Sequence, residues 1–118
     1  MPEGWTVLKI NGPLFFAAAD RVFGEMAQLC QQRQGIILYM DGVPILDAGG
    51  LSALNKLIAT CERDGTQIVI ADLQFQPLRT LARAGVAPIA GVSRYTSSLD
   101  EALRLISCPA SETDRVSG

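Results

Sequence analysis

The sequence predicts an α/β fold with about four helices and a mixed sheet of four to five strands that opens with a β-hairpin. Short apolar runs alternate along the chain with longer segments whose apolar residues recur at helical spacing. An Asn-Gly pair, which is typical of tight turns, separates the first two apolar runs. The third run, residues 36–40, leads into a loop rich in Gly and Pro and then into the clearest helical pattern of the chain.

The hairpin is predicted from the first sixteen residues. Trp5–Ile10 has the length and composition of a strand, and Asn11-Gly12 closes it. Leu14–Phe16, after Pro13, is the expected return strand. A hairpin at this place makes two neighbouring strands antiparallel, so we expect a mixed sheet.

A helix over residues 19–33 and a buried strand over residues 36–40 are expected next. Apolar residues recur three and four positions apart in the helix, and Gly35 suits a left-handed position at its end. The strand is a continuous run of strand formers, Ile-Ile-Leu-Tyr-Met. The loop that follows ends at Asp47, whose carboxylate is placed to cap the next helix by accepting from amides one turn further on.

The helix after Asp47 is predicted to bury one face and to stop at Asp64-Gly65. Its apolar stripe consists of Leu51, Leu54, Leu57, Ile58 and Cys61. A strand over residues 66–71 follows. Its three consecutive residues Ile-Val-Ile are typical of a strand that is covered on both faces in a parallel arrangement.

A short helix is expected to begin at Pro77 and to run through Ala84, with Gly85 as its C-terminal glycine. Residues 86–89 are a candidate for a short last strand. The sequence Ser98-Leu99-Asp100-Glu101 has the capping-box pattern and begins a final helix.

We expect one domain over residues 1–107 and a polar, disordered tail over residues 108–118.

The composition excludes several classes of function. The 118 residues carry 10 basic and 12 acidic side chains, a net charge of −2, without the clustered basic charge that a nucleic-acid surface needs. No apolar run approaches the ~18 residues of a membrane helix, and the N-terminus lacks the features of a signal peptide. We therefore expect an intracellular setting.

Nothing in the sequence indicates catalysis, a metal or a cofactor. Histidine is absent, which removes the usual general base and the commonest metal ligand. Cys30, Cys61 and Cys108 are odd in number and form no Cys-x-x-Cys pair, so we expect reduced thiols with a packing role. No glycine-rich phosphate loop is present, and an Asp41–Asp47 carboxylate pair is better explained by local turns.

Two segments are candidates for partner binding. The first turn of the central helix, Asp47-Ala48-Gly49-Gly50, presents backbone amides that attract an anion or an acidic side chain, although Asp47 itself repels one. The alternative is a plain helix cap whose glycines allow close packing. Arg79 and Arg83 stand four apart on the third helix and suit an acidic protein or a phosphate, the alternative being a solvated helix face.

Three segments resemble a known family. The run Asp47-Ala48-Gly49-Gly50-Leu51 after a buried strand resembles the loop of the domain shared by sulfate transporters and anti-sigma factor antagonists, called STAS. In the antagonists this loop resembles Asp-Ser-Ser-Gly-Leu, and a partner kinase phosphorylates the serine next to the glycine. Gly49 stands at that serine position, so the phosphoacceptor is missing.

Two further segments resemble the transporter branch of this family. Residues 12–19, Gly-Pro-Leu-Phe-Phe-Ala-Ala-Ala, resemble a segment of STAS domains at the C-terminus of SulP-type anion transporters. Residues 74–85 resemble the bacterial dicarboxylate-type members. The resemblance covers roughly residues 6–106 and implies the STAS fold, which is that of the antagonist SpoIIAA.

The resemblance implies a non-catalytic regulatory domain at the cytoplasmic face of the inner membrane. The missing membrane portion would move sulfate, bicarbonate or dicarboxylates, and the domain would support assembly as a homodimer and bind regulators. In an enteric relative the implied partner is acyl carrier protein, which is acidic. It would dock at Asp47–Leu51 and also contact Arg79 and Arg83. The alternatives are a stand-alone antagonist of an anti-sigma kinase and a nucleotide-binding module.

Overall fold

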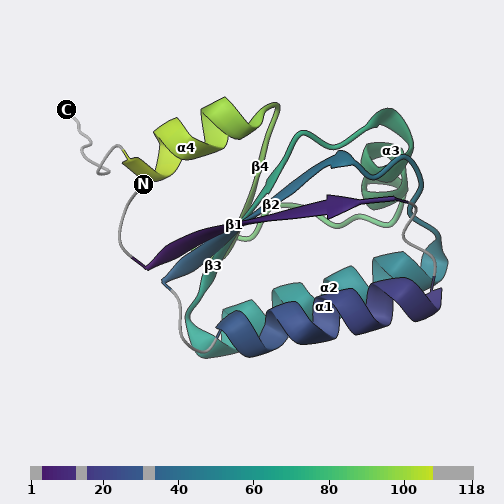
Figure 1. The fold of residues 1–118 in the computed structure, drawn as a ribbon, viewed down its shortest axis with the longest axis horizontal. Coiled ribbons are helices and arrows are strands. Elements are labelled where there is room, and N and C mark those ends of the chain that lie inside the picture. Colours follow the sequence, from purple (N-terminus) through teal and green to yellow (C-terminus); the bar gives the residue numbers. More distant parts are fainter. Residues whose placement is uncertain (1–3, 13–15, 31–33, 108–118) are drawn as a thin grey trace.

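The computed structural model describes residues 4–12, 16–30 and 34–107, which form one open sheet with helices on both of its faces (Figure 1). In chain order the elements are β1 (Trp5–Asn11), α1 (Phe16–Cys30), β2 (Gly35–Gly42), α2 (Ala48–Asp64), β3 (Gln67–Ala71), α3 (Phe75–Arg83), β4 (Ser93–Thr96) and α4 (Leu99–Ser107). The strands follow one another in the order β1-β2-β3-β4, and all three pairs are parallel. The α/β class and the four helices are confirmed.

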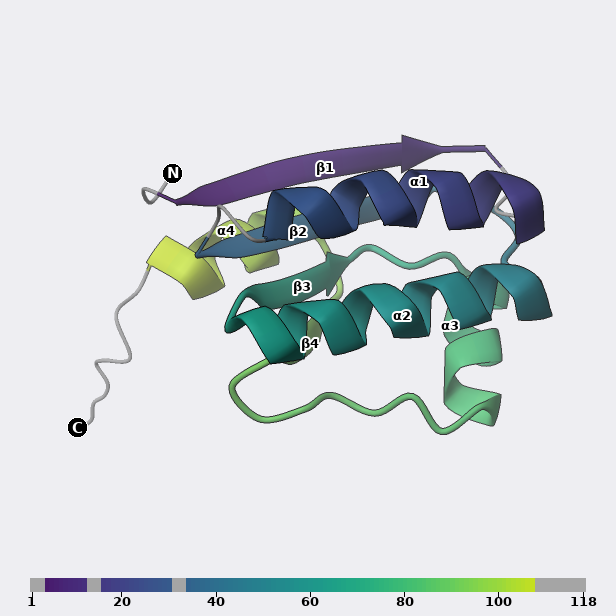
Figure 2. The ribbon, with the colours of Figure 1, turned by 90° about the horizontal axis from the view of Figure 1, so that it is seen from below.

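The helices form two unequal layers. Figure 2 shows α1 and α2 side by side along one face of the sheet, and α4 lies against the opposite face (Figure 1). The shorter helix α3 lies near the end of the sheet to which the β1 arrow points (Figure 1). Because all described strands are parallel, the loop that starts α2 and the whole of α3 lie at the carboxyl ends of the strands.

Alternation along the strands divides the core into two clusters. Ile36, Leu38 and Met40 of β2 point to α1 and α2, while Ile37 points to α4. Residues 36–38 and Met40 are completely buried, since β2 has a neighbour on each side and helices on both faces. This arrangement explains the continuous apolar run of the strand. Cys61 is a buried part of the larger cluster.

The predicted caps of α2 are confirmed. Asp47 has extended backbone, and its Oδ1 accepts from the amide of Gly50 at 2.7 Å. At the other end Gly65 adopts the left-handed conformation, with φ of 74°. That conformation is open to glycine at little cost and explains the stop after Asp64.

The capping box of α4 is confirmed in a modified form. Ser98 Oγ accepts from the amide of Glu101 at 3.0 Å, as the pattern requires. The Glu101 carboxylate accepts from the amide and the hydroxyl of Ser97, at 2.6 and 2.9 Å, one residue before the usual partner.

The predicted hairpin and mixed sheet are wrong for the described residues. Gly12 donates to the carbonyl of Gly42 at 2.7 Å, so Asn11-Gly12 prolongs the parallel pairing of β1 with β2 and does not reverse the chain. Of the expected return strand, residues 14 and 15 lie outside the described residues and Phe16 begins α1. Helix α1 is thus the crossover between two parallel strands.

Two helix starts also differ from expectation, and two further predicted boundaries cannot be compared. Helix α1 begins three residues before Ala19, and the expected end at residues 31–33 lies outside the described residues. Helix α3 begins at Phe75, with Pro77 as its third residue, where the missing N–H would have had no helical acceptor. The tail predicted over residues 108–118 lies outside the described residues.

Two further expectations are wrong: Gly35 as the end of a helix, and a last strand over residues 86–89. Gly35 begins β2 without a positive φ, and a Cβ built on it meets the Trp5 indole at 2.4 Å, so the ring explains the glycine. Residues 86–89 form no strand, and Pro88 lacks the amide that a ladder needs. Instead β4 is Ser-Arg-Tyr-Thr, a sequence without the apolar run of a buried strand.

Candidate functional site

The first turn of α2 is partly closed by its own cap. Asp47 uses its carboxylate on the amide of Gly50 and its carbonyl oxygen on the amide of Leu51, at 2.7 and 2.8 Å. Gly50 is also buried, so the expectation that both glycines leave their amides open is wrong for Gly50. Within residues 4–12, 16–30 and 34–107, the backbone amides of Ala48 and Gly49 have no hydrogen-bond acceptor. These two amides, at an exposed and a half-buried residue, are the accessible part of the turn.

The loop before α2 is fastened to α3 by polar side chains of the helix. Gln76 Oε1 accepts from the amide of Leu46 at 2.8 Å, and its Nε2 donates to the carbonyl of the same residue at 3.3 Å. Thr80 Oγ1 donates to that carbonyl at 3.4 Å, and Gln74 donates to the carbonyl of Asp41. These residues belong to no motif that predicts a site. Their signal was the spacing of Gln76 and Thr80, which places both on one face of a helix.

This fastening brings the two predicted segments together. Since Leu46 immediately precedes Asp47, its bonds to Gln76 and Thr80 hold the start of α2 against α3, which carries Arg79 and Arg83. Both arginines are exposed. The guanidinium of Arg79 lies 5.8 Å from the centroid of the Phe75 ring, a cation–π distance.

The family model of the STAS domain matches residues 2–102 of the 118. The chain belongs to the STAS family. Among solved structures, this STAS domain is similar to a sulfate transporter family protein from Wolinella succinogenes, with a TM-score of 0.76 and 31% identity over 90% of this chain and 87% of that one. It is also similar to the SulP transporter STAS domain from Vibrio cholerae, with a TM-score of 0.67 and 25% identity over 91% and 87%.

The anti-sigma factor antagonist SpoIIAA in its unphosphorylated form shares the fold, with a TM-score of 0.65 over 91% of this chain and 94% of that one. At 14% identity, this likeness shows a shared fold alone. A search of curated protein sequences found no match. The fold expected from the resemblance is confirmed, and the sheet of this STAS domain has four parallel strands in the described residues.

The acidic residues near the site serve separate local roles. Asp47 caps α2, whereas Asp41 Oδ1 lies 3.7 Å from Lys9 Nζ, and Lys9 lies 5.1 Å from the centroid of the Tyr39 ring. The pKa of Tyr39 is raised, first by its hydrogen bond to Asp41, then by desolvation and by the negative charges of Asp41 and Asp72. In the part of the chain that the structure describes, no three His, Cys, Asp or Glu side chains are arranged to hold a metal ion.

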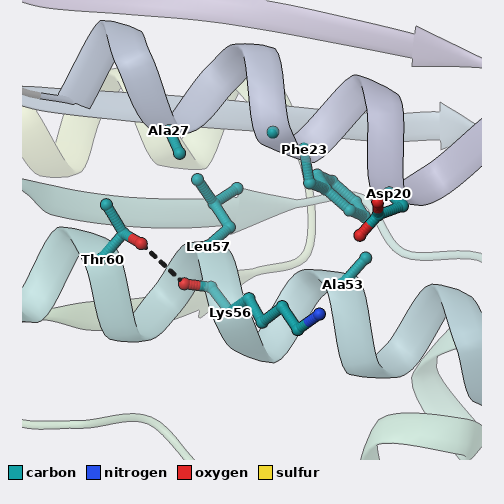
Figure 3. A pocket seen from close by; sticks show the side chains of 8 residues that line it. Asp20, Phe23, Ala27, Ala53, Lys56, Leu57 and Thr60 are labelled. Carbon is teal, nitrogen blue, oxygen red and sulfur yellow. Dashed lines mark hydrogen bonds between the residues drawn. The ribbon is translucent and has the colours of Figure 1, made fainter.

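A hollow lies between α1 and α2 of the STAS domain (Figure 3). Its volume is about 70 Å³, and it is lined by Asp20, Phe23, Gly24, Ala27, Ala53, Lys56, Leu57 and Thr60. Sites for small molecules usually have volumes of roughly 300–1,000 Å³, so this hollow is a seam between two packed helices.

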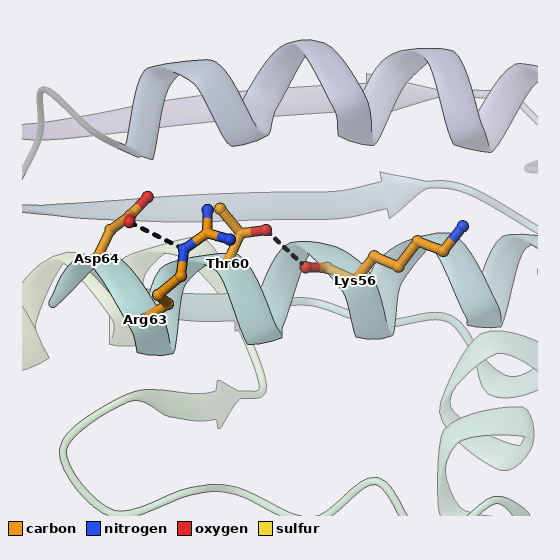
Figure 4. A network of polar contacts seen from close by, with 4 residues as sticks. All are labelled: Lys56, Thr60, Arg63 and Asp64. Carbon is orange, nitrogen blue, oxygen red and sulfur yellow. Dashed lines mark hydrogen bonds and ion pairs between the residues drawn. The ribbon is translucent and has the colours of Figure 1, made fainter.

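The neighbouring polar contacts along α2 are local too (Figure 4). Thr60 donates to the carbonyl of Lys56 at 2.9 Å, and Arg63 bonds Asp64 at 3.3 Å. Exposed contacts of this kind contribute little to stability. Of the helices in the described residues, none combines the length and the apolar character that crossing a membrane requires.

Proposed function

We propose that this STAS domain is a non-catalytic regulatory and protein-interaction module of a SulP-type anion transporter. The observation that carries the proposal is the likeness to two transporter-associated chains, at 31% and 25% identity, over 87% of each. The membrane portion of the same polypeptide would carry sulfate, bicarbonate or a dicarboxylate. The domain would lie at the cytoplasmic face of the inner membrane.

The antagonist function is disfavoured by one position. Gly49 occupies the place at which the resemblance puts the phosphorylated serine, and glycine offers no hydroxyl to a kinase. Ser52 is exposed but lies almost a full turn further along α2. A switch through phosphorylation of this loop therefore has no acceptor at the expected position.

The partner surface of the proposal comprises Asp47–Leu51 together with Arg79 and Arg83. Three observations support it: the open amides of Ala48 and Gly49, the exposure of both arginines, and the bonds between Leu46 and α3 that hold the two segments together. An acidic partner such as acyl carrier protein has the complementary charge.

Three experiments test the proposal. The reading frame upstream of Pro2 should encode several hundred predominantly apolar residues, and a stop codon there would overturn the transporter assignment. Titration of ¹⁵N-labelled domain with acyl carrier protein should shift the amide resonances of Gly49, Gly50 and Arg79. Unchanged spectra would exclude this partner. Sedimentation velocity on the same sample tests the homodimer that the family resemblance implies.

A further inference from the structure

Large apolar side chains are exposed around α3. Among the described residues, four large hydrophobic side chains are exposed, and three of them belong to α3 or to the loop fastened to it. Phe75 is 75% exposed, Leu78 50% and Ile45 41%. Together with two arginines these form what we call the α3 surface, which consists of Ile45, Phe75, Leu78, Arg79 and Arg83. Exposed apolar side chains that gather in one place, and do not occur singly, mark interaction sites.

The α3 surface is distinct from the side of the helix that builds the core. Pro77 and Leu81 are the buried residues of α3, and Gln76 and Thr80 reach the backbone of Leu46. Successive residues of a helix are offset by about 100°, so Phe75 lies roughly opposite Pro77, whereas Leu78 lies at the edge of the buried side, about 60° from Leu81. Arg79 and Arg83 lie between Phe75 and the flank that carries Gln76 and Thr80. Leu46 is bonded to this flank, and Ile45 precedes it.

The charge of this region differs from that of the rest of the chain. Residues 73–99 contain three arginines and no acidic residue, so this segment carries +3, whereas the whole chain carries −2 and the remainder therefore −5. The acidic residues beside the segment are Asp72, which precedes it in the sequence, and Asp41 and Asp47 in the loop fastened to α3. A symmetric contact with a second copy would place Arg79 and Arg83 of both copies against each other. The complementary partner is acidic, with apolar side chains at its centre.

We propose that the α3 surface binds an acidic protein through an amphipathic helix whose apolar side chains contact Phe75, Leu78 and Ile45. Carboxylates beside those side chains pair with Arg79 and Arg83. This inference rests on the proposed function and deepens it, because it moves the main anchor from the first turn of α2 to α3. The reason is that Asp47 already occupies the Gly50 and Leu51 amides, while the Phe75 side chain is three-quarters exposed.

The geometry favours a preformed site. Gln76 bonds both polar backbone groups of Leu46, so the position of Ile45 relative to α3 is fixed before a partner arrives. A surface that is already ordered loses less conformational entropy on binding. Aromatic and arginine side chains, the residue types of Phe75 and Arg79, are also the commonest anchors of interfaces.

Three synthetic helical peptides of about 18 residues test the inference, since an amphipathic helix of that length presents several turns of one face. The first has leucines at helical spacing on a glutamate background, the second replaces glutamate by lysine, and the third replaces leucine by serine. With ¹⁵N-labelled domain, only the Leu/Glu peptide should shift the amides of Ile45, Phe75, Leu78 and Arg79. No shifts, equal shifts with the Leu/Lys peptide, or shifts confined to α1 and α2 would overturn the proposal.

Variants identify the contacts. The double variant Phe75→Ser/Leu78→Ser should weaken binding of the Leu/Glu peptide about tenfold or more, whereas Ile89→Ser, which removes the fourth exposed apolar side chain, should leave binding unchanged. Arg79→Glu/Arg83→Glu should reverse the preference toward the Leu/Lys peptide. Arg94→Glu, at an exposed arginine of β4, should not. Equal effects of test and control variants would contradict the assignment.

The outcomes separate this inference from the proposed partner. If acyl carrier protein causes no shifts while the Leu/Glu peptide binds at α3, the partner is wrong and the surface is right. If acyl carrier protein shifts Gly49 while the peptides do not reach Phe75, the anchor lies on α2 and the present inference is wrong.

Discussion

Gln76 and Leu46 are thirty residues apart, yet the side-chain amide of Gln76 bonds both the N–H and the C=O of Leu46, at 2.8 and 3.3 Å. A side-chain amide that pairs with a backbone in this way satisfies the two polar groups that a strand neighbour would otherwise satisfy. Leu46 itself is completely buried. This pair therefore sets the distance between the start of α2 and α3, the two parts of the proposed partner surface.

Gln76→Ala should destabilise the domain by about 1–3 kcal/mol, because the amide of the buried Leu46 loses its acceptor. Urea unfolding at constant m-value measures the change. Gln74→Ala is the matched control, since it removes one exposed bond to the carbonyl of Asp41 and should cost less. Hydrogen exchange should become faster at Leu46 in the first variant only. An equal loss in the free energy of unfolding for the two variants would show that the bonds to Leu46 do not account for the destabilisation.

Asp47→Ala should cost about 1 kcal/mol in the free energy of unfolding, because the amide of Gly50 loses its cap. Asp47→Asn should retain most of the stability, since asparagine caps helices about as well as aspartate. The same two variants also test the binding of an acidic partner. Both variants remove the negative charge beside the open amides of Ala48 and Gly49, so an acidic partner should bind either variant more tightly than the wild type. Weaker binding would mean that the Asp47 carboxylate contacts the partner.

The local features of the fold were predictable from sequence, whereas the contacts that position the site were not. Asp47 as a cap and Gly65 as a stop follow from neighbouring residues, and the burial of residues 36–38 follows from their composition. The Gln76–Leu46 pair depends on where two distant segments meet, which no local pattern encodes. Asn11-Gly12 failed as a hairpin signal because Gly12 continues the bonding to Gly42. The strand β4 was missed because its four residues lack an apolar run.

Gly35→Ala and Gly24→Ala should change stability in opposite directions. A Cβ at Gly35 would lie 2.4 Å from the indole of Trp5, so the ring must move from its contact with the cluster that faces α4. Gly24, in α1, has nothing within 4 Å of the added Cβ. Alanine there should stabilise the helix by up to about 1 kcal/mol, because it restricts the unfolded chain. Thermal unfolding of both variants, with Trp5 fluorescence as a probe of the ring, tests the contrast. An unchanged midpoint for Gly35→Ala would mean that the indole relocates at no cost.

The cap of α4 should make the stability of the domain depend on pH. The pKa of Glu101 is lowered, first by its hydrogen bond from the Ser97 amide and then by that from the Ser97 hydroxyl, so the folded state favours the carboxylate. The stabilisation is therefore complete above the usual value of 4.5 and is lost as the pH falls through the lowered value in the folded state. Glu101→Gln should consequently destabilise the domain more at about pH 7 than at a pH below the lowered pKa of the folded state, where the wild-type side chain is itself protonated. Urea unfolding of both proteins at the two pH values measures this difference, and Glu62→Gln on the exposed part of α2 controls for the loss of one charge.

Because α4 buries Ala102 against the sheet, fraying of this cap should first expose the cluster around Ile37 and Val69. A protection factor against hydrogen exchange that falls at Ala102 on acidification, in the wild type and not in Glu101→Gln, is the expected signature once the intrinsic pH dependence of exchange is divided out. Identical protection factors in both would contradict the role of this carboxylate.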